Sequence, residues 1–168
     1  MQQVNYLSAY PAALQQQIQQ LIEQQQLGHW LRAKYPHEHQ LSNDQALRDY
    51  ALEIKNRYMR KSAPLSKVVY DPKIHVLKHA LGLHSYVSRV QGNKLKSKNE
   101  IRISSLFKKG PEAFLQMIVV HELAHLKEKQ HNKAFYQLCQ HMLPHYHQLE
   151  FDTRVYLTHL ELIGPVYS

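Results

Sequence analysis

Cysteine is almost absent from this chain, because only Cys139 among the 168 residues is a cysteine. A single cysteine can form no disulfide within the chain, and it excludes metal sites that are built from several cysteines. We therefore expect a protein suited to a reducing compartment, in which Cys139 packs as a small apolar residue.

Long apolar stretches are missing as well. No segment approaches the roughly 20 apolar residues that a helix needs to cross a bilayer. The first residues, MQQVNY, lack the basic stretch followed by an apolar run that marks a secretory signal. These absences predict a soluble, cytoplasmic protein with no membrane partner.

Acidic residues are fewer than basic ones, with 13 Asp and Glu against 21 Lys and Arg and a formal net charge of +8. Such a charge favours nucleic acid, a nucleotide or another anionic partner, although a solvated basic surface has the same composition. A chain of 168 residues with 43% hydrophobic residues predicts a single domain, 1–168. Within it we distinguish a helical N-terminal lobe, 1–63, from a second part, 64–168, that carries the candidate metal site.

The first third of the chain is predicted to be helical. Pro11 suits a helix start, and apolar residues recur at helical spacing among glutamines until Gly28, where we expect the first helix to end. Ser42 and Gln45 match a capping box for a second helix, which ends before Pro64.

The pattern then changes to that of short strands. Residues 68–70 (VVY) predict a strand, and residues 74–81 predict a helix ended by Gly82. The segments 86–90 and 100–104 are rich in β-branched residues or alternate between apolar and polar ones, which predicts an antiparallel hairpin. Between these two strands we expect a turn at Gly92-Asn93 and a basic connecting loop with Lys94, Lys96 and Lys98. The predicted class is α+β, mostly helical with a small antiparallel sheet.

A strongly apolar helix is predicted to begin at Pro111-Glu112 and to contain the motif HELAH at 121–125. Two histidines four residues apart on a helix project from the same face, so His121 and His125 can bind one zinc ion. Glu122 points roughly 100° around the helix, where it can act as general base on water bound to zinc. Burial of this carboxylate in an apolar run is costly unless an ion or hydrogen bonds compensate, and the setting therefore predicts a metal site.

A third protein ligand is required, because a catalytic zinc usually has three protein ligands and one open position. The spacing of His121, His125 and His131 equals that of the metzincin proteases, although Glu128 stands where those enzymes have glycine. Glu150 is the alternative, as an acidic ligand of the thermolysin type. The spacing favours His131 and leaves Glu150 open.

Other residues are candidates for supporting roles. Asn132 is predicted to cap a further helix, which runs to Met142. Tyr136, Arg89 and Arg102 could each stabilise a developing oxyanion if they face the metal.

The segment 111–146 combines the Pro-Glu helix start, VVHELAHL at 119–126, His131-Asn132, Phe135 and Pro144. In these features it resembles the YgjP-like metal-dependent hydrolases, a metallopeptidase-like family. The helical front half of the chain and residues 88–92 also resemble this family. The resemblance implies that His121, His125 and His131 bind zinc and that Glu122 is catalytic. It also implies a minimal gluzincin-like fold, with the sheet packed on the motif helix.

The predicted function is that of a zinc-dependent metallohydrolase, and the resemblance implies that it acts on peptide bonds. One alternative is a nucleotide pyrophosphatase, because zinc chemistry serves phosphoanhydrides equally well and some family members are labelled as acting on UTP. A second is a nucleic-acid-guided protease, which needs a basic face joined to the site. The contrasting hypothesis is a non-enzymatic metal-binding module, although structural zinc normally has four protein ligands, often cysteines.

Overall fold

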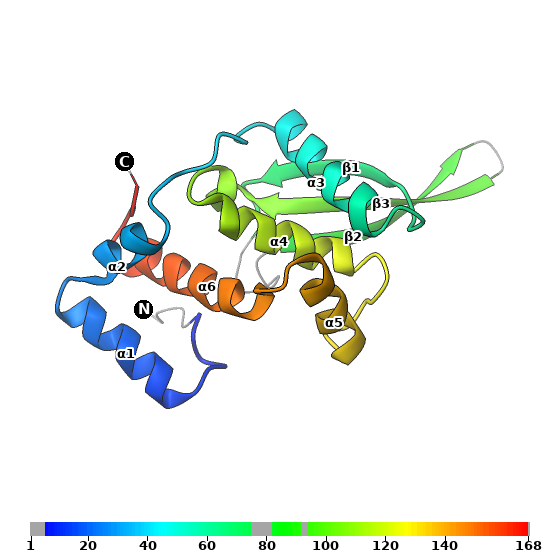
Figure 1. Ribbon diagram of the computed structural model, residues 1–168. Helices are drawn as coiled ribbons and strands as arrows, with labels where there is room; N and C mark the ends of the chain where they lie inside the picture. Colours follow the sequence, from blue (N-terminus) through cyan, green and yellow to red (C-terminus); the bar gives the residue numbers. More distant parts are fainter. Residues whose placement is uncertain (1–5, 75–81, 92–93, 168) are drawn as a thin grey trace.

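The computed structural model describes residues 6–74, 82–91 and 94–167 (Figure 1). Within these ranges, the side chains of residues 82–91 and 94–98 are not described. The described elements, in chain order, are α1 (Ala12–Glu23), α2 (Leu27–Lys34), α3 (Asp44–Tyr58), β1 (Leu65–Asp71), β2 (Gly82–Gln91), β3 (Lys94–Ser104), the 3₁₀ helix η1 (Ser105–Lys108), α4 (Glu112–Ala124), α5 (Lys133–Met142) and α6 (Tyr146–Leu162). The predicted class, mostly helical with a small sheet, is confirmed.

The sheet is mixed, with β3 between its two neighbours. β2 and β3 form the predicted antiparallel hairpin, in which Val90 lies opposite Leu95. β1 pairs with β3 in parallel, with Val68 opposite Ile101, so the prediction of a purely antiparallel sheet was wrong. The residue pattern of β1 marks it as a strand, but the direction of pairing depends on the chain path, which places β2 on the far side of β3.

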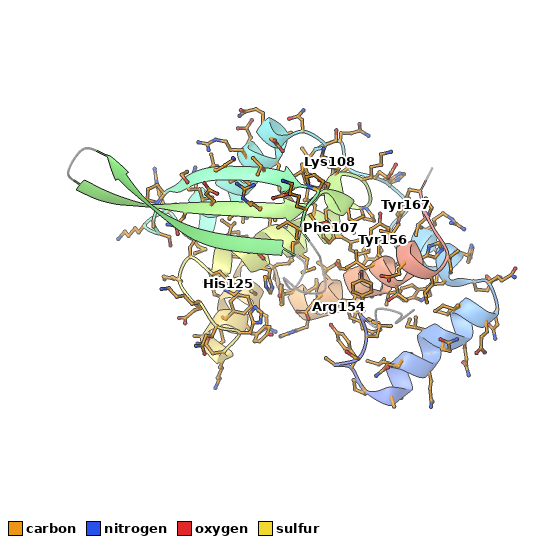
Figure 2. All side chains as sticks on the ribbon, turned by 180° about the vertical axis from the view of Figure 1, so that it is seen from behind. Phe107, Lys108, His125, Arg154, Tyr156 and Tyr167 are labelled. Carbon is orange, nitrogen blue, oxygen red and sulfur yellow. The ribbon has the colours of Figure 1, made fainter. Side chains whose placement is uncertain are left out.

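One face of the sheet packs on helices. Ile101 and Ile103 of β3 are fully buried on this face, level with Val68 and Tyr70 of β1. Successive side chains of a strand point to opposite faces, so Arg102 lies on the other one. Figure 1 shows α3 and α4 side by side in front of the sheet, and in Figure 2, seen from behind, no described helix lies in front of it.

α4 lies at the centre of the fold, between the sheet, α3, α5 and α6. It begins directly after Pro111, as predicted. Ten of its thirteen residues are buried, and they occupy all sides of the helix. None of the described helices is long and apolar enough to span a membrane.

The end of the first helix was wrongly predicted. α1 ends at Glu23, and Gln25 takes a positive φ of 57° before the chain enters α2. Gly28 lies within α2, where an added Cβ would come within 3.0 Å of His159 on α6. The glycine therefore permits close packing of two helices rather than ending one.

Two further details differ from the sequence-based prediction. The N-cap of α3 is Asn43, whose Oδ1 accepts a hydrogen bond from the Ala46 amide at 2.8 Å, rather than Ser42. Residues 94–98 belong to β3 and not to a connecting loop, because the hairpin ladder continues to the pair Gln91 and Lys94. The helix predicted over 74–81 and the turn at 92–93 fall almost entirely outside the described residues.

Candidate metal centre

Three histidines from two neighbouring segments meet at the C-terminal end of α4. His121 and His125 lie one turn apart on the same side of the helix end, and His131 is in the loop before α5. One nitrogen from each ring lies within 4.8 Å of the others. The structure therefore brings together the three histidines that the sequence analysis selected, in an arrangement that can hold one ion.

Two of the ring nitrogens are spaced like the ligands of one metal ion. The Nε2 atoms of His125 and His131 are 3.1 Å apart, and a tetrahedral zinc ion with bonds of ~2.0–2.1 Å has ligand atoms about 3.4 Å apart. Exposure increases across the cluster, from buried His121 through half-buried His125 to exposed His131. A substrate can therefore approach from the His131 side.

The Nδ1 atoms of the two helical histidines are held by hydrogen bonds. His121 Nδ1 lies 2.7 Å from the hydroxyl oxygen of Tyr146, and His125 Nδ1 lies 2.9 Å from the carbonyl oxygen of Glu128. An Nδ1–H that donates to oxygen leaves Nε2 with the lone pair that binds a metal, and it fixes the orientation of the ring. The carbonyl oxygen can only accept, which gives His125 this tautomer, and the hydroxyl of Tyr146 can accept from His121 in the same way.

Burial favours the neutral form of two of the three histidines. The pKa of His121 is well below its ordinary value, first because the ring is buried, and then because of the rings of His125 and His131 and the guanidinium of Arg154. Burial and Arg154 also lower the pKa of His131, against an opposing effect of Glu150. Metal ions bind neutral imidazole, so these shifts favour binding.

Phe135 of α5 forms the apolar wall behind the three rings. Its ring is stacked on His125 at a centroid distance of 4.6 Å, and it contacts His121 at 5.0 Å and His131 at 4.9 Å. Asn132 caps α5 as predicted, accepting a hydrogen bond from the Phe135 amide at 2.8 Å. The cap therefore fixes the start of the helix that places Phe135 against the cluster.

Glu122 lies beside the cluster and is almost completely buried, with 1% of its surface exposed. Its Oε1 atom is 4.0 Å from His121 Nε2. Its Oε2 atom has no hydrogen-bond partner among the described residues, and burial raises the pKa of the carboxyl well above its ordinary value. A buried carboxylate oxygen without a hydrogen bond is costly, and a metal ion with bound water nearby would offset that cost.

The other candidates from the sequence lie elsewhere. Glu150, the alternative third ligand, is outside the three-histidine cluster; its Oε1 accepts a hydrogen bond from the Tyr10 hydroxyl at 3.2 Å. Arg102 pairs with two carboxylates on the sheet face away from α4. Tyr136 lies at the edge of the site, 6.3 Å from His131 between ring centroids. The side chain of Arg89 lies outside the described part of the structure.

Tyr146 was missed by the sequence analysis. It is fully buried at the start of α6, and its pKa is raised above the ordinary range by burial first and then by the charge of Glu150. The hydroxyl therefore stays protonated and can accept from His121 while it donates to Glu150. Twenty-five residues separate Tyr146 from His121, so only the packing of α6 on α4 reveals the contact.

The donor set suits a catalytic metal. Three imidazoles converge, two of them with hydrogen-bonded Nδ1 atoms, and a buried carboxyl whose Oε2 atom has no described partner lies next to them. Such a set fits an ion with three protein ligands and an open position, whereas a structural zinc has a closed shell of four. The fold and the site thus define a metal-dependent hydrolase as the class of protein.

The comparisons with known proteins agree with this class. A family model described as YgjP-like, metallopeptidase domain, matches residues 34–152. A curated protein of Escherichia coli (strain K12), named UTP pyrophosphatase, is 59% identical over 162 residues, which cover 96% of this chain and 97% of the relative. No solved structure matches the chain. The chain belongs to the YgjP-like family, which confirms the resemblance seen in residues 111–146.

Replacement of Tyr146 by Phe is expected to weaken zinc binding by roughly 10- to 100-fold, because His121 loses the oxygen that orients its ring. The ring volume is retained, so the fold should persist. Competition with a chelator of known affinity measures the change, and circular dichroism checks the fold. As a control, Tyr156→Phe alters another buried tyrosine of α6 that does not contact the cluster in the described structure; equal zinc affinity in both variants would refute the role of Tyr146.

Proposed function

We propose that this protein is a zinc-dependent hydrolase that cleaves the phosphoanhydride bonds of nucleoside triphosphates, UTP in particular. The observation that carries the proposal is the three-histidine cluster with Glu122 beside it, in a chain that is 59% identical to a protein named UTP pyrophosphatase. The net charge of +8 also suits an anionic substrate.

His121, His125 and His131 would hold the ion. Imidazole ligands suit zinc well, although geometry and availability also decide which metal is bound. When bound, zinc supplies Lewis-acid polarisation of a substrate oxygen and lowers the pKa of its bound water to about 7.

Glu122 would act as general base. Its carboxyl lies against His121 and is held in an apolar setting that raises its pKa, which makes the carboxylate a stronger proton acceptor. Water would attack the α-phosphorus of UTP, the bond to the β-phosphate would break, and UMP and pyrophosphate would form while the proton of the water passes to Glu122. The exposed His131 side of the cluster provides the entrance.

Peptide hydrolysis is the second candidate. The family model describes a metallopeptidase domain, and HELAH at 121–125 is the motif in which a glutamate activates water for attack on a carbonyl carbon. The same ligands and the same base serve both reactions. The two candidate functions therefore differ in the substrate and not in the metal ligands or the base.

A hydrolysis screen of the zinc-loaded protein against UTP, the other nucleoside triphosphates, unfolded proteins and peptides tests the proposal. The blank is the Glu122→Gln protein, so that contaminating hydrolases are detected. We expect release of pyrophosphate from UTP by the wild-type protein alone. Cleavage of peptides without cleavage of triphosphates would replace the proposed function with the second candidate, and zinc binding without any hydrolysis would favour a binding module.

A further inference from the structure

Arg154 is a cation of α6, the helix that packs on α4 beside the candidate metal centre. It follows Tyr146 by two turns and Glu150 by one turn of the helix. In Figure 2, Arg154 and His125 both lie below the sheet, on α6 and at the end of α4. Only 21% of its side chain is exposed, so its guanidinium is largely withdrawn from water but still accessible.

The hydrogen bonds of this guanidinium are incomplete. One terminal nitrogen donates to the carbonyl oxygen of Tyr6 at 3.2 Å. Nε lies 3.6 Å from Glu150 Oε1, beyond hydrogen-bond distance, and has no hydrogen-bond partner among the described residues. Nε is buried and cannot meet a substrate, but a guanidinium has five N–H donors, and the described hydrogen bond occupies one donor of one terminal nitrogen, so donors on the terminal nitrogens remain for another acceptor.

Glu150 neutralises Arg154 only in part. Its Oε1 atom also accepts a hydrogen bond from the hydroxyl of Tyr10. The charge of Glu150 also acts on Tyr146, whose pKa it raises. Arg154 shares α6 with Tyr146, whose hydroxyl oxygen lies 2.7 Å from His121 Nδ1, so this partly compensated charge is held on the helix that packs against the metal centre. A cation placed beside a divalent ion is repelled by it unless an anion lies between them.

We propose that Arg154 binds the phosphate chain of the substrate, so that the nucleotide is held between this guanidinium and the metal ion. The inference rests on the proposed function and adds to it the residue that selects phosphates. The planar guanidinium forms paired hydrogen bonds with phosphate oxygens, and partial burial strengthens them. A peptide carries no comparable charge, so the same residue would discriminate against peptides.

The test uses the full-length, zinc-loaded protein with Arg154→Met and Arg154→Lys. We expect KM for UTP to rise about 10-fold or more in Arg154→Met, since the variant loses charge-assisted hydrogen bonds to the phosphates, and to rise less in Arg154→Lys. Arg32→Met is the matched control, because Arg32 also donates one hydrogen bond of 3.2 Å to a backbone carbonyl, that of Val166, but belongs to α2. KM should not change in this control.

A second measurement does not depend on turnover. Titration calorimetry of inorganic triphosphate into Glu122→Gln protein, with and without Arg154→Met, should show weaker binding by a similar factor when Arg154 is replaced, at unchanged zinc content. A lower melting temperature with unchanged KM and unchanged triphosphate binding would overturn the inference and leave Arg154 as an anchor for Tyr6. Failure of the wild-type protein to hydrolyse any nucleoside triphosphate would instead overturn the proposed function.

Discussion

A Glu122→Gln protein is expected to retain its zinc and its fold but to lose at least about 100-fold in kcat, the contribution that a positioned general base usually makes. Glutamine has the shape of glutamate but cannot accept the proton from water. Because the carboxyl of Glu122 is buried, with its Oε2 unpartnered among the described residues and its pKa raised, the neutral amide should leave the free energy of unfolding equal or slightly higher. Steady-state kinetics, zinc analysis and thermal unfolding measure the three quantities.

Glu128→Gln is the matched control for this variant. Glu128 also lies in the segment next to the cluster. Its side chain accepts a hydrogen bond from the Asn132 amide group at 3.4 Å, and its backbone carbonyl lies 2.9 Å from His125 Nδ1. We expect its kcat to stay close to the wild-type value. If Glu122→Gln and Glu128→Gln were equally active, Glu122 could not be the general base.

Replacement of Phe135 by Ala is expected to lower the free energy of unfolding by about 3–5 kcal/mol, the usual cost of removing a buried phenyl ring. Phe135 is fully buried, and it is in ring contact with His121, His125 and His131. Zinc affinity should therefore fall together with stability, because the imidazoles lose the wall that orients them. Chemical denaturation and chelator competition measure the two effects.

Phe107→Ala separates the two effects. Phe107 is also buried, with 1% of its surface exposed, but it belongs to η1 and has no ring contact with the histidines in the described structure. We expect a comparable loss of stability with unchanged zinc affinity of the folded protein. The same zinc affinity in Phe135→Ala and Phe107→Ala would show that Phe135 supports the core alone.

Much of the secondary structure could be predicted because its signals are local. Pro111 before an apolar run marks the start of α4, and Asn132 is the N-cap of α5. The motif 121–125 likewise depends only on helical periodicity, so two candidate ligands could be assigned before the fold was known. The alternation in 100–104 identifies β3, although the strand begins earlier, at Lys94.

Features that depend on packing could not be predicted. Glycine often follows the end of a helix, but Gly28 lies inside α2, where its lack of a side chain leaves room for His159 of α6. Tyr146 and Arg154 belong to a helix that approaches the cluster only in the folded chain, and no spacing in the sequence links them to His121. Spacing also left Glu150 open as a ligand, and its place near Tyr10 and Arg154 follows from the position of the N-terminal segment against α6.

The most direct test of the metal centre is X-ray absorption spectroscopy of the zinc-loaded wild-type protein, combined with anomalous diffraction at the zinc edge. We predict one ion per chain, bound by the imidazoles of His121, His125 and His131 at ~2.0–2.1 Å with oxygen from solvent or substrate in the remaining position. Failure to retain zinc, or an ion bound by fewer than three imidazoles with Glu150 as a ligand, would contradict this account.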